Sequence, residues 1–300
     1  MLAITQKVFG GPEVLDIEEV DRPRPGAGEV LVRVAATSVN PADWKVRAGL
    51  VDRIGEPPLT LGFDVSGIIE ELGPGADRFG VGDAVYGMVF GGANAEYVVV
   101  QAHALAPKPH RIDHVHAAAL PTAALTAWQA LAAIGAGQRI LVHAAAGGVG
   151  HLAVQMAKHR GAYVIGTARA ANHEYLRGLG ADELIDYTAT DFGTAVRDLD
   201  IVLDLVGGEY GSRSARVLRP DGRLIDTQGS DAEDDPRYER FYVEPSWVSL
   251  REITTMVEHG YLGVTIDQVL PLAEVAKAHQ ISESGRVRGK IVLVPWNPPA

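Results

Sequence analysis

Cysteine is absent from this chain of 300 residues. This absence excludes disulfide bonds, zinc sites with thiolate ligands and a cysteine nucleophile. Long apolar runs are also missing, because no uninterrupted stretch approaches the length of a membrane span. Residues 1–13 lack the charged region followed by a long apolar stretch that marks a secretory signal. We therefore expect a cytoplasmic protein with no membrane partner.

Basic residues are outnumbered, since 27 Lys and Arg stand against 38 Asp and Glu and give a formal net charge of −11. Broad electrostatic attraction to nucleic acid is therefore not expected. The ten histidines leave imidazole metal sites open. Only His110, His114 and His116 are clustered, and their spacing in a proline-rich join matches no standard ligand set. We expect no bound metal.

The segment Arg139–Lys158 combines a buried strand, a glycine-rich turn and an amphipathic helix in immediate succession. Ala145, Gly147 and Gly150 occupy the first, third and sixth positions of the dinucleotide fingerprint, with Ala in place of the first Gly. The middle Gly lets a pyrophosphate approach the backbone, the last lets the helix pack closely on the strand, and the helix start attracts anions. The residues predicted to bind the cofactor here are Ala145, Gly147, Gly148, Val149 and Gly150.

Four short apolar segments follow, at residues 163–168, 183–187, 200–207 and 222–229, and helix-compatible stretches separate them. This alternation predicts an α/β fold with a doubly wound parallel sheet. The loops after the last two segments would emerge at the carboxyl ends of strands, beside the crevice where such sheets bind ligands. The residues predicted to lie near the nicotinamide half of a cofactor are Val206, Gly207, Gln228 and Gly229.

The end of the second predicted strand indicates which dinucleotide binds. It reads Thr167, Ala168, Arg169 and offers no carboxylate for the ribose 2′-hydroxyl of NAD. An Arg about twenty residues beyond the glycines suits a 2′-phosphate through its charge and its fork of donors. A solvated surface Arg without a ligand is the alternative. We predict NADPH over NADH, with Thr167 and Arg169 at the cofactor.

Residues 16–109 have a different pattern, in which short β-rich runs alternate with Gly and Pro turns and predict an irregular β-barrel-like domain. Residues 121–138 predict a helix that leads into the nucleotide domain. Residues 288–296 return to strand character and would complete the first domain, which would then be discontinuous. The length fits two domains better than one. We assign no role to the acidic segment 230–240.

Over nearly its whole length, the chain resembles the zinc-independent quinone oxidoreductases (zeta-crystallin-like) and enone reductases of the medium-chain dehydrogenase/reductase superfamily. The resemblance rests on segments in the family's order: NPADWK, LGFDVSG, GVGDAVYG, AEYVVV, ALPTAALTAW, AAAGGVG, LGADELIDY and RGKIVLV. It implies a GroES-like catalytic domain over residues 1–117 completed by 266–300, and a Rossmann domain over residues 118–265. It also implies a cleft between the domains and a homodimer joined through the Rossmann sheets.

Alcohol-oxidising members of the superfamily hold a catalytic zinc with Cys, His and Cys. In this chain the resemblance places the neighbourhood of Pro41, Phe63 and Thr122 at those positions, and none of them replaces a thiolate or an imidazole. Without a Lewis acid, the acceptor has to be electron-poor already, as a quinone or an α,β-unsaturated carbonyl is. The resemblance therefore implies NADPH-dependent hydride transfer to a small quinone or enone without zinc.

Lys45 and Asn40 are the catalytic candidates, because similar reductases place a Tyr or Lys after NPAD close to the nicotinamide. As a cation, Lys45 would stabilise negative charge on the acceptor's carbonyl oxygen, whereas a surface lysine is the alternative. By the same resemblance, the Asn40 amide would point toward the cofactor ribose or nicotinamide. Asp43 and Asp64 are interpreted as structural.

Further site residues are assigned by aromatic character or by analogy with the family. Aromatic faces bind flat conjugated substrates, although each such residue is more often core packing. The candidates for the substrate pocket are Trp44, Phe63 and Tyr86, with Phe241 as a further wall. By analogy, Tyr187 borders the adenosine or phosphate end of the cofactor, Phe241 and Val243 lie near the nicotinamide, and Lys290 lies near the cleft.

Two alternatives remain open from the sequence. One is a reductase of enoyl thioesters or of other specialised metabolites. The other is a catalytically silent NADPH-binding protein that acts as an interaction module, because a fold does not establish an activity.

Overall fold

The computed structural model describes residues 1–52 and 54–296 of the chain. The chain forms two compact units. Unit 1 comprises Met1–Leu125, Pro245–Gly260 and Val264–Ala300, and unit 2 comprises Thr126–Glu244 and Tyr261–Gly263. The domain ranges predicted from the sequence, 1–117 with 266–300 and 118–265, stay a prediction.

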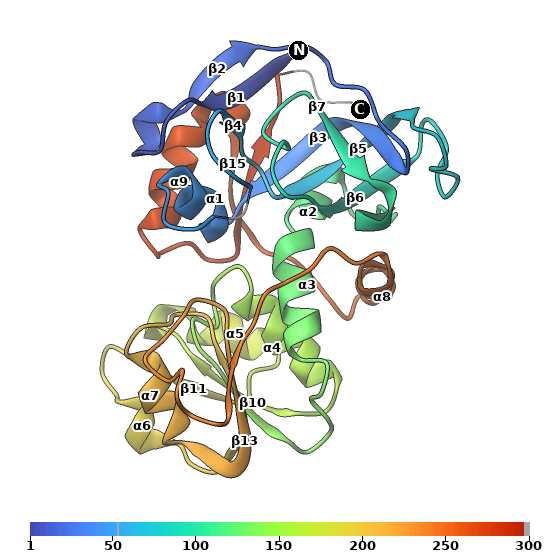
Figure 1. Cartoon of the computed structure of the whole chain (residues 1–300). Helices are drawn as coiled ribbons and strands as arrows, with labels where there is room; N and C mark the ends of the chain where they lie inside the picture. Colours follow the sequence, from blue (N-terminus) through green and yellow to red (C-terminus); the bar gives the residue numbers. More distant parts are fainter. Residues whose placement is uncertain (53, 297–300) are drawn as a thin grey trace. The chain divides into compact units, whose positions relative to one another are not determined.

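Unit 2 is built on a parallel sheet of six strands in the order β11-β10-β9-β12-β13-β14. Figure 1 labels β10, β11 and β13 of this sheet. The strands are β9 (Arg139–Val142), β10 (Tyr163–Thr167), β11 (Glu183–Ile185), β12 (Leu199–Asp204), β13 (Leu218–Asp226) and β14 (Tyr238–Arg240). The first strand, β9, lies in the middle, so the strand order reverses on either side of it, and ligands bind at such a reversal. The predicted doubly wound parallel sheet is confirmed.

Helices cover the strands of unit 2 because the strands are apolar on both faces. Ile140, Leu141 and Val142 are consecutive on β9 and so point to alternate faces of the sheet, and each is 0% exposed. The helices within unit 2 are α4 (Gly150–His159), α5 (His173–Gly178), α6 (Phe192–Ala195) and α7 (Tyr210–Ala215), with a 3-10 turn η3 (Ala170–Asn172). In α3 (Pro121–Ala130) the chain passes from unit 1 to unit 2 between Leu125 and Thr126.

Unit 1 is mainly antiparallel. Its larger sheet has the order β15-β16-β3-β5-β6-β8, with β7 also paired to β3, and a smaller sheet has the order β2-β1-β4. The strands are β1 (Leu2–Gln6), β2 (Asp16–Glu19), β3 (Glu29–Val39), β4 (Leu59–Thr60), β5 (Asp64–Leu72), β6 (Ala84–Met88), β7 (Tyr97–Gln101), β8 (Leu105–Pro107), β15 (Ile266–Pro271) and β16 (Lys290–Val294). Because β16 pairs with the end of β3, residues about 250 positions apart in the sequence become neighbours.

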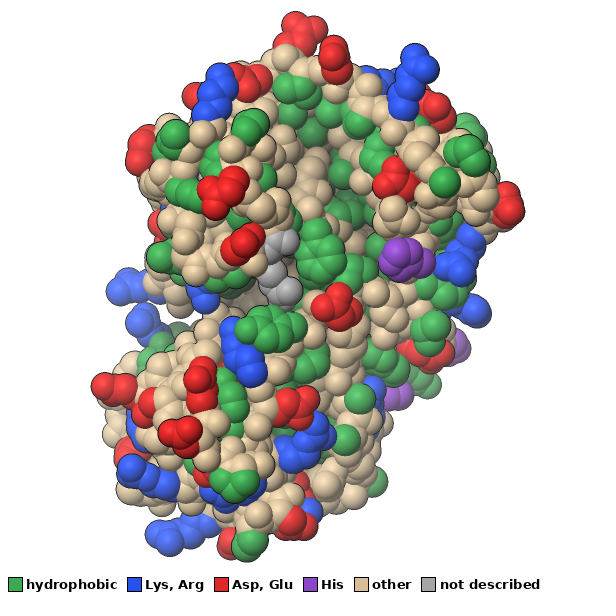
Figure 2. Space-filling view, viewed as in Figure 1, with side chains coloured by type: hydrophobic (Ala, Val, Ile, Leu, Met, Phe, Trp, Pro, Cys, Tyr) green, Lys and Arg blue, Asp and Glu red, His purple; other side chains and the backbone are tan. Residues whose placement is uncertain are grey.

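Short helices complete unit 1. They are α1 (Pro41–Arg47), α2 (His114–Ala118), α8 (Trp247–Glu258) and α9 (Val275–Glu283), with 3-10 turns η1 (Pro12–Val14), η2 (Ala102–Ala104) and η4 (Leu272–Glu274). Within the described residues, no helix has both the length and the apolar character required to cross a bilayer. The face displayed in Figure 2 carries basic side chains interspersed with acidic ones.

Candidate active site

The glycine-rich turn of unit 2 connects β9 to α4. Ala144 adopts a positive φ of 48°, and the Ala145 N–H donates to Thr167 O at 3.0 Å, which ties the turn to the end of β10. A Cβ at Gly150 would lie 2.7 Å from Ala145 Cα and 2.8 Å from Ala145 C, and closer still to Ala144 O. Only glycine therefore lets α4 begin this close to the turn.

The same turn fits the pyrophosphate of a dinucleotide. A Cβ at Gly147 would meet only Ala144 O, at 3.2 Å, so this glycine has little protein around the place of its missing side chain. Helix α4 begins at Gly150 after Val149, whose side chain makes no capping hydrogen bond. No side chain caps the first N–H groups of α4, and little protein covers the backbone at Gly147, so this helix start is suited to binding an anion. Gly148 completes the turn between these residues.

The end of β10 brings two predicted residues together. Arg169 Nε donates to the Tyr187 hydroxyl at 3.1 Å, and Tyr187 is 41% exposed. Thr167 is 1% exposed, and its hydroxyl is occupied by a hydrogen bond of 3.1 Å with Nδ1 of His143. The Arg169–Tyr187 pair thus presents a cation and a phenol at the surface of unit 2, whereas the Thr167 side chain faces the interior.

Two buried aspartates shape the loops that carry Val206, Gly207, Gln228 and Gly229. At the end of β12, Asp204 Oδ1 accepts from the N–H groups of Val206 and Gly207 at 2.8 and 3.0 Å. At the neighbouring end of β13, Asp226 Oδ1 accepts from the N–H groups of Gln228 and Gly229 at 2.6 and 3.0 Å.

The two loops also contact each other. The Gly208 N–H donates to Gly229 O at 2.9 Å, and the Thr227 N–H donates to Asp204 O at 3.1 Å. Gly207 has a φ of +77°, and a Cβ there would lie 2.7 Å from Gln228 Cβ. The structure therefore brings the four predicted loop residues together at the carboxyl edge of the sheet.

The aspartates were missed as functional residues by sequence reasoning. The sequence does carry a signal for them. In DLVG (204–207) and DTQG (226–229), an Asp at the end of a strand can accept from the backbone N–H groups of the residues two and three positions later. Burial, together with the nearby charges of Asp226 and Asp231, raises the pKa of Asp204. Phe241 and Val243 follow β14 and are half-buried, and the Phe241 N–H donates to Asp226 O at 2.8 Å.

His143 is a second residue that sequence reasoning missed. It is 0% exposed, and its Nε2 makes a hydrogen bond of 3.0 Å with the Ser214 hydroxyl. Burial, reinforced by the charge of Arg213, lowers the pKa of His143 to about 3. His143 is therefore neutral at ordinary pH and links β10 to α7 beneath the carboxyl edge of the sheet.

In unit 1, the predicted catalytic residues lie around the start of α1. Asn40 precedes the helix, and its backbone N–H donates to Asp43 Oδ2 at 2.8 Å, which is one half of a capping box. Asp43 Oδ1 accepts from the Gly62 N–H at 3.0 Å, so this carboxyl joins the helix start to the segment before β5. Burial raises the pKa of Asp43 to about 7, although both backbone donors lower it.

The Asn40 side chain belongs to a buried polar network with Asp64 and Lys290. Lys290 Nζ donates to Asn40 Oδ1 at 2.5 Å and lies 3.3 Å from Asp64 Oδ2. Asp64 Oδ2 accepts from Asn40 Nδ2 at 2.8 Å, and Asp64 Oδ1 accepts from the Thr122 N–H at 2.7 Å. Lys290, predicted near the cofactor, is 3% exposed and engaged within unit 1.

The remaining predicted residues differ in exposure. Trp44 and Lys45 on α1 are half-buried, and Lys45 Nζ lies 5.6 Å from the centroid of the Trp44 ring. Phe63 is 2% exposed and packs in a cluster with Val46 and Leu61. Tyr86 is 0% exposed, and its hydroxyl donates to Leu250 O at 2.9 Å. Phe63 and Tyr86 therefore occupy core environments within unit 1, and their place in a substrate pocket stays a prediction.

A catalytic zinc does not fit the positions where the resemblance would place it. Phe63 offers only an apolar buried ring, and the Thr122 N–H is directed at Asp64. Across residues 1–52 and 54–296, no group of three His, Asp or Glu side chains is arranged so as to hold a metal ion. No chemical step is therefore assigned to zinc in this chain.

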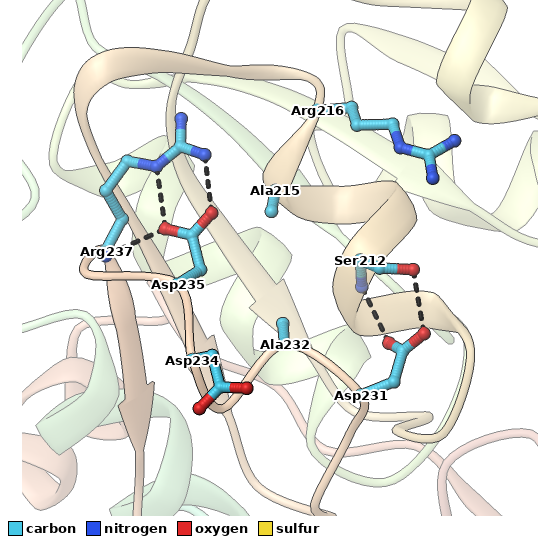
Figure 3. A pocket seen from close by; sticks show the side chains of 8 residues that line it. All are labelled: Ser212, Ala215, Arg216, Asp231, Ala232, Asp234, Asp235 and Arg237. Atoms are coloured by element: carbon cyan, nitrogen blue, oxygen red, sulfur yellow. Dashed lines mark hydrogen bonds and ion pairs between the residues drawn. The ribbon is translucent and has the colours of Figure 1, made fainter.

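The acidic segment forms one wall of a surface pocket of about 360 Å³ in unit 2 (Figure 3). In it, Asp235 pairs with Arg237 at 2.7 Å, and Asp231 accepts from the N–H and the hydroxyl of Ser212 at 2.7 and 2.8 Å. The lining residues are Ser212, Ala215, Arg216, Asp231, Ala232, Asp234, Asp235 and Arg237, none of which was predicted to bind cofactor or substrate.

Comparisons with known proteins agree with this geometry. Residues 26–110 match the family described as alcohol dehydrogenase GroES-like domain, and residues 179–293 match the family described as zinc-binding dehydrogenase. A 2-methylene-furan-3-one reductase of Solanum lycopersicum is 33% identical, over 96% of this chain and 77% of its own length.

Two solved structures extend the likeness to the whole fold. The quinone oxidoreductase of Coxiella burnetii is 35% identical with a TM-score of 0.93, and the comparison covers 98% of this chain and 99% of that one. The Escherichia coli quinone oxidoreductase complexed with NADPH is 27% identical with a TM-score of 0.91, over 98% and 100% of the two chains. This chain therefore belongs to the medium-chain dehydrogenase/reductase family, among its quinone oxidoreductases and enone reductases.

Proposed function

We propose that this chain is an NADPH-dependent reductase that transfers a hydride to a small quinone or α,β-unsaturated carbonyl without zinc. The observation that carries the proposal is the turn between β9 and α4, where Gly150 permits close packing and Gly147 leaves the backbone bare. NADPH supplies the hydride when it is bound. Relatives named as quinone oxidoreductase and as 2-methylene-furan-3-one reductase support both acceptor classes.

Unit 2 supplies the groups that hold the cofactor. The start of α4 and the backbone around Gly147 receive the pyrophosphate. The paired loops held by Asp204 and Asp226 present Val206 and Gln228 to the nicotinamide half. Because each aspartate already accepts two loop N–H groups, the loops are shaped before the cofactor arrives, and ordering them costs little on binding.

Unit 1 supplies the groups that act on the acceptor. The Lys45 ammonium stabilises the negative charge that develops on the acceptor's carbonyl oxygen, and Trp44 beside it offers a flat apolar face. Asn40 donates from its amide to the nicotinamide half of the cofactor. The roles of Lys45 and Asn40 come from the resemblance and from their positions, Lys45 on α1 and Asn40 directly before it.

Arg169 supports NADPH rather than NADH. Its guanidinium is held by Tyr187 on the surface of unit 2, and a cation with a fork of donors matches a 2′-phosphate. The test is a pair of dissociation constants measured by calorimetry for NADPH and NADH. We expect tighter binding of NADPH, with the preference lost in Arg169→Ala and kept in Arg177→Ala, a matched surface variant of unit 2. Equal affinities in the unaltered chain would refute the preference.

The reductase proposal is tested by following NADPH absorbance with a panel of quinones, enones and enoyl thioesters. We expect turnover of quinones or free enones and a large loss of kcat/KM in Lys45→Ala, but not in Lys277→Ala on the exposed face of α9. Thioesters outcompeting free acceptors would favour the specialised reductase. Tight NADPH binding without turnover of any acceptor would favour the interaction module. Unchanged kcat and KM in Lys45→Ala would remove this lysine from the chemistry.

The resemblance also leads us to propose a homodimer joined through the Rossmann sheets and a cytoplasmic location. Sedimentation of the purified chain tests the first, and fractionation of the source cell tests the second.

A further inference from the structure

The amide of Asn40 is held at both of its polar atoms by a buried ion pair. Lys290 Nζ donates to Asn40 Oδ1 at 2.5 Å, and Asn40 Nδ2 donates to Asp64 Oδ2 at 2.8 Å. The ammonium lies 3.3 Å from that same carboxylate oxygen, and the side chains of Lys290 and Asp64 are 3% and 0% exposed. The three groups therefore form a closed triangle away from water.

The two charges select one orientation of the amide. Rotating it by half a turn would place its NH₂ group against the Lys290 ammonium and its carbonyl against the Asp64 carboxylate, and both contacts would repel. Such interactions are stronger in a buried setting than in water. The direction of the amide is therefore fixed by charge, in addition to packing.

Further hydrogen bonds hold the triangle in place. The Ser38 hydroxyl donates to Asp64 Oδ2 at 2.5 Å, and the Thr122 N–H donates to the other oxygen at 2.7 Å. The backbone N–H of Asn40 is held separately by Asp43. With its carbonyl on Lys290 and one Nδ2 hydrogen on Asp64, the Asn40 side chain keeps its second Nδ2 hydrogen for another acceptor.

We propose that Lys290 is a positioning residue which, with Asp64, fixes the Asn40 amide so that this second Nδ2 hydrogen is directed at the ligand. The inference deepens the proposed function and rests on the role given there to Asn40. It assigns Lys290 to the orientation of Asn40 instead of the direct cofactor contact predicted from the sequence. The acceptor that such a donor recognises is a hydroxyl or carboxamide oxygen in the nicotinamide half.

Nuclear magnetic resonance of the full chain labelled with ¹⁵N-asparagine tests the orientation without any cofactor. The sequence contains four asparagines, so the spectrum holds four side-chain NH₂ pairs, and the Asn40 pair is identified by its loss in Asn40→Ala. In the unaltered chain, we expect its two hydrogens to differ widely in chemical shift and in exchange with water, because only one is bonded to Asp64. Equal exchange of the two hydrogens would overturn the proposal, with no variant needed.

Three variants then test the part played by Lys290. In Lys290→Gln the charge is gone, and the new amide can present either its oxygen or its nitrogen to Asn40. We therefore expect the separation of the Asn40 pair to shrink to that of an exposed asparagine, whose two hydrogens still differ because the amide C–N bond rotates slowly. Lys290→Arg keeps a cation and should keep the separation. Lys277→Gln, at a lysine that is 58% exposed, should leave the pair unchanged. An Asn40 pair unaffected by Lys290→Gln would contradict the inference.

Ligand affinity provides a readout that a general loss of structure would not imitate. For Lys290→Gln we expect the dissociation constant of NADPH to rise about 10-fold, the size of one oriented hydrogen bond. The constant for 2′,5′-ADP, which lacks the whole nicotinamide half including its ribose, should stay within about two-fold. Equal weakening of both ligands would reject the positioning role. Failure of the unaltered chain to bind NADPH would instead refute the proposed function, and the asparagine signals would still decide the orientation.

Discussion

Two glycines of the same turn should fail in different ways when each is replaced by alanine. In Gly150→Ala, the new Cβ would lie 2.7 and 2.8 Å from Ala145 Cα and C. Backbone atoms cannot move aside as a flexible side chain does, so α4 must shift, at a cost of about 1–3 kcal/mol for overpacking. Alanine regains up to about 1 kcal/mol through its higher helix propensity, so from the middle of the overpacking range, about 2 kcal/mol, we expect a net loss of about 1–2 kcal/mol.

In Gly147→Ala, the same methyl group meets only Ala144 O, at 3.2 Å. Its φ is not among the positive values found at other glycines, so the backbone conformation suits alanine, and only the Ala144 carbonyl oxygen has to give way, by a few tenths of an ångström. Stability should therefore stay within about 0.5 kcal/mol of the unaltered chain, helped by the lower entropy of the unfolded variant. The methyl group does block the approach of a pyrophosphate, and the dissociation constant of NADPH should rise at least about 10-fold.

The assay combines urea unfolding followed by far-ultraviolet circular dichroism with calorimetric titration of NADPH. Gly178→Ala is the matched control, because a Cβ there meets nothing within 4 Å and the residue lies on α5 of the same unit. We expect the control to keep its NADPH affinity and to lose no stability, with a gain of up to about 1 kcal/mol from helix propensity. Normal NADPH affinity in Gly147→Ala would refute the assignment of this turn to the pyrophosphate. Full stability in Gly150→Ala would refute the reasoning from contact distances.

Three further substitutions have predicted effects on stability, and two of them also test ligand binding. Asp43 has a pKa raised from 3.8 to about 7, so its contribution to stability is present at low pH and is lost as pH rises toward and through 7. Urea titrations of the unaltered chain and of Asp43→Asn give the difference between their unfolding free energies, and this difference should fall by about 2.5 kcal/mol between pH 5 and pH 8. The same pH dependence of stability in both proteins would contradict this. Asp204→Ala leaves the loop N–H groups of Val206 and Gly207 without their acceptor and should cost about 1–3 kcal/mol by thermal unfolding, with weaker NADPH binding, whereas the exposed Asp234→Ala should change neither. Tyr86→Phe removes a buried hydroxyl and should lower stability by about 0.5–1.5 kcal/mol with the acceptor KM unchanged, and a changed KM at full stability would return Tyr86 to the substrate pocket.

The sheet of unit 2 could be predicted from the sequence because its signals are local. Each strand, such as Arg139–Val142, is a short apolar run next to a turn, and a parallel sheet follows from their alternation with helices. The glycine-rich turn with Gly147 and Gly150 could be predicted for the same reason, because the fingerprint spans only six consecutive residues.

The polar network of unit 1 could not be predicted in this way. Lys290 meets Asn40 across about 250 residues of sequence, and only the pairing of β16 with β3 brings them together. Phe63 and Tyr86 illustrate a second limit. An aromatic residue has the same appearance in a sequence whether it lines a pocket or fills a core, and only its neighbours decide between the two.

The late position of Lys290 has a consequence for synthesis on the ribosome. Residues 126–244, which make up most of unit 2, leave the ribosome well before the strand that carries this lysine. Until that strand arrives, the Asp64 carboxylate lacks the Lys290 ammonium and β3 lacks β16, one of the strands that pair with it. Most of unit 2 can thus fold while the chain is still being synthesised, whereas unit 1 completes its larger sheet only after β16 has been synthesised.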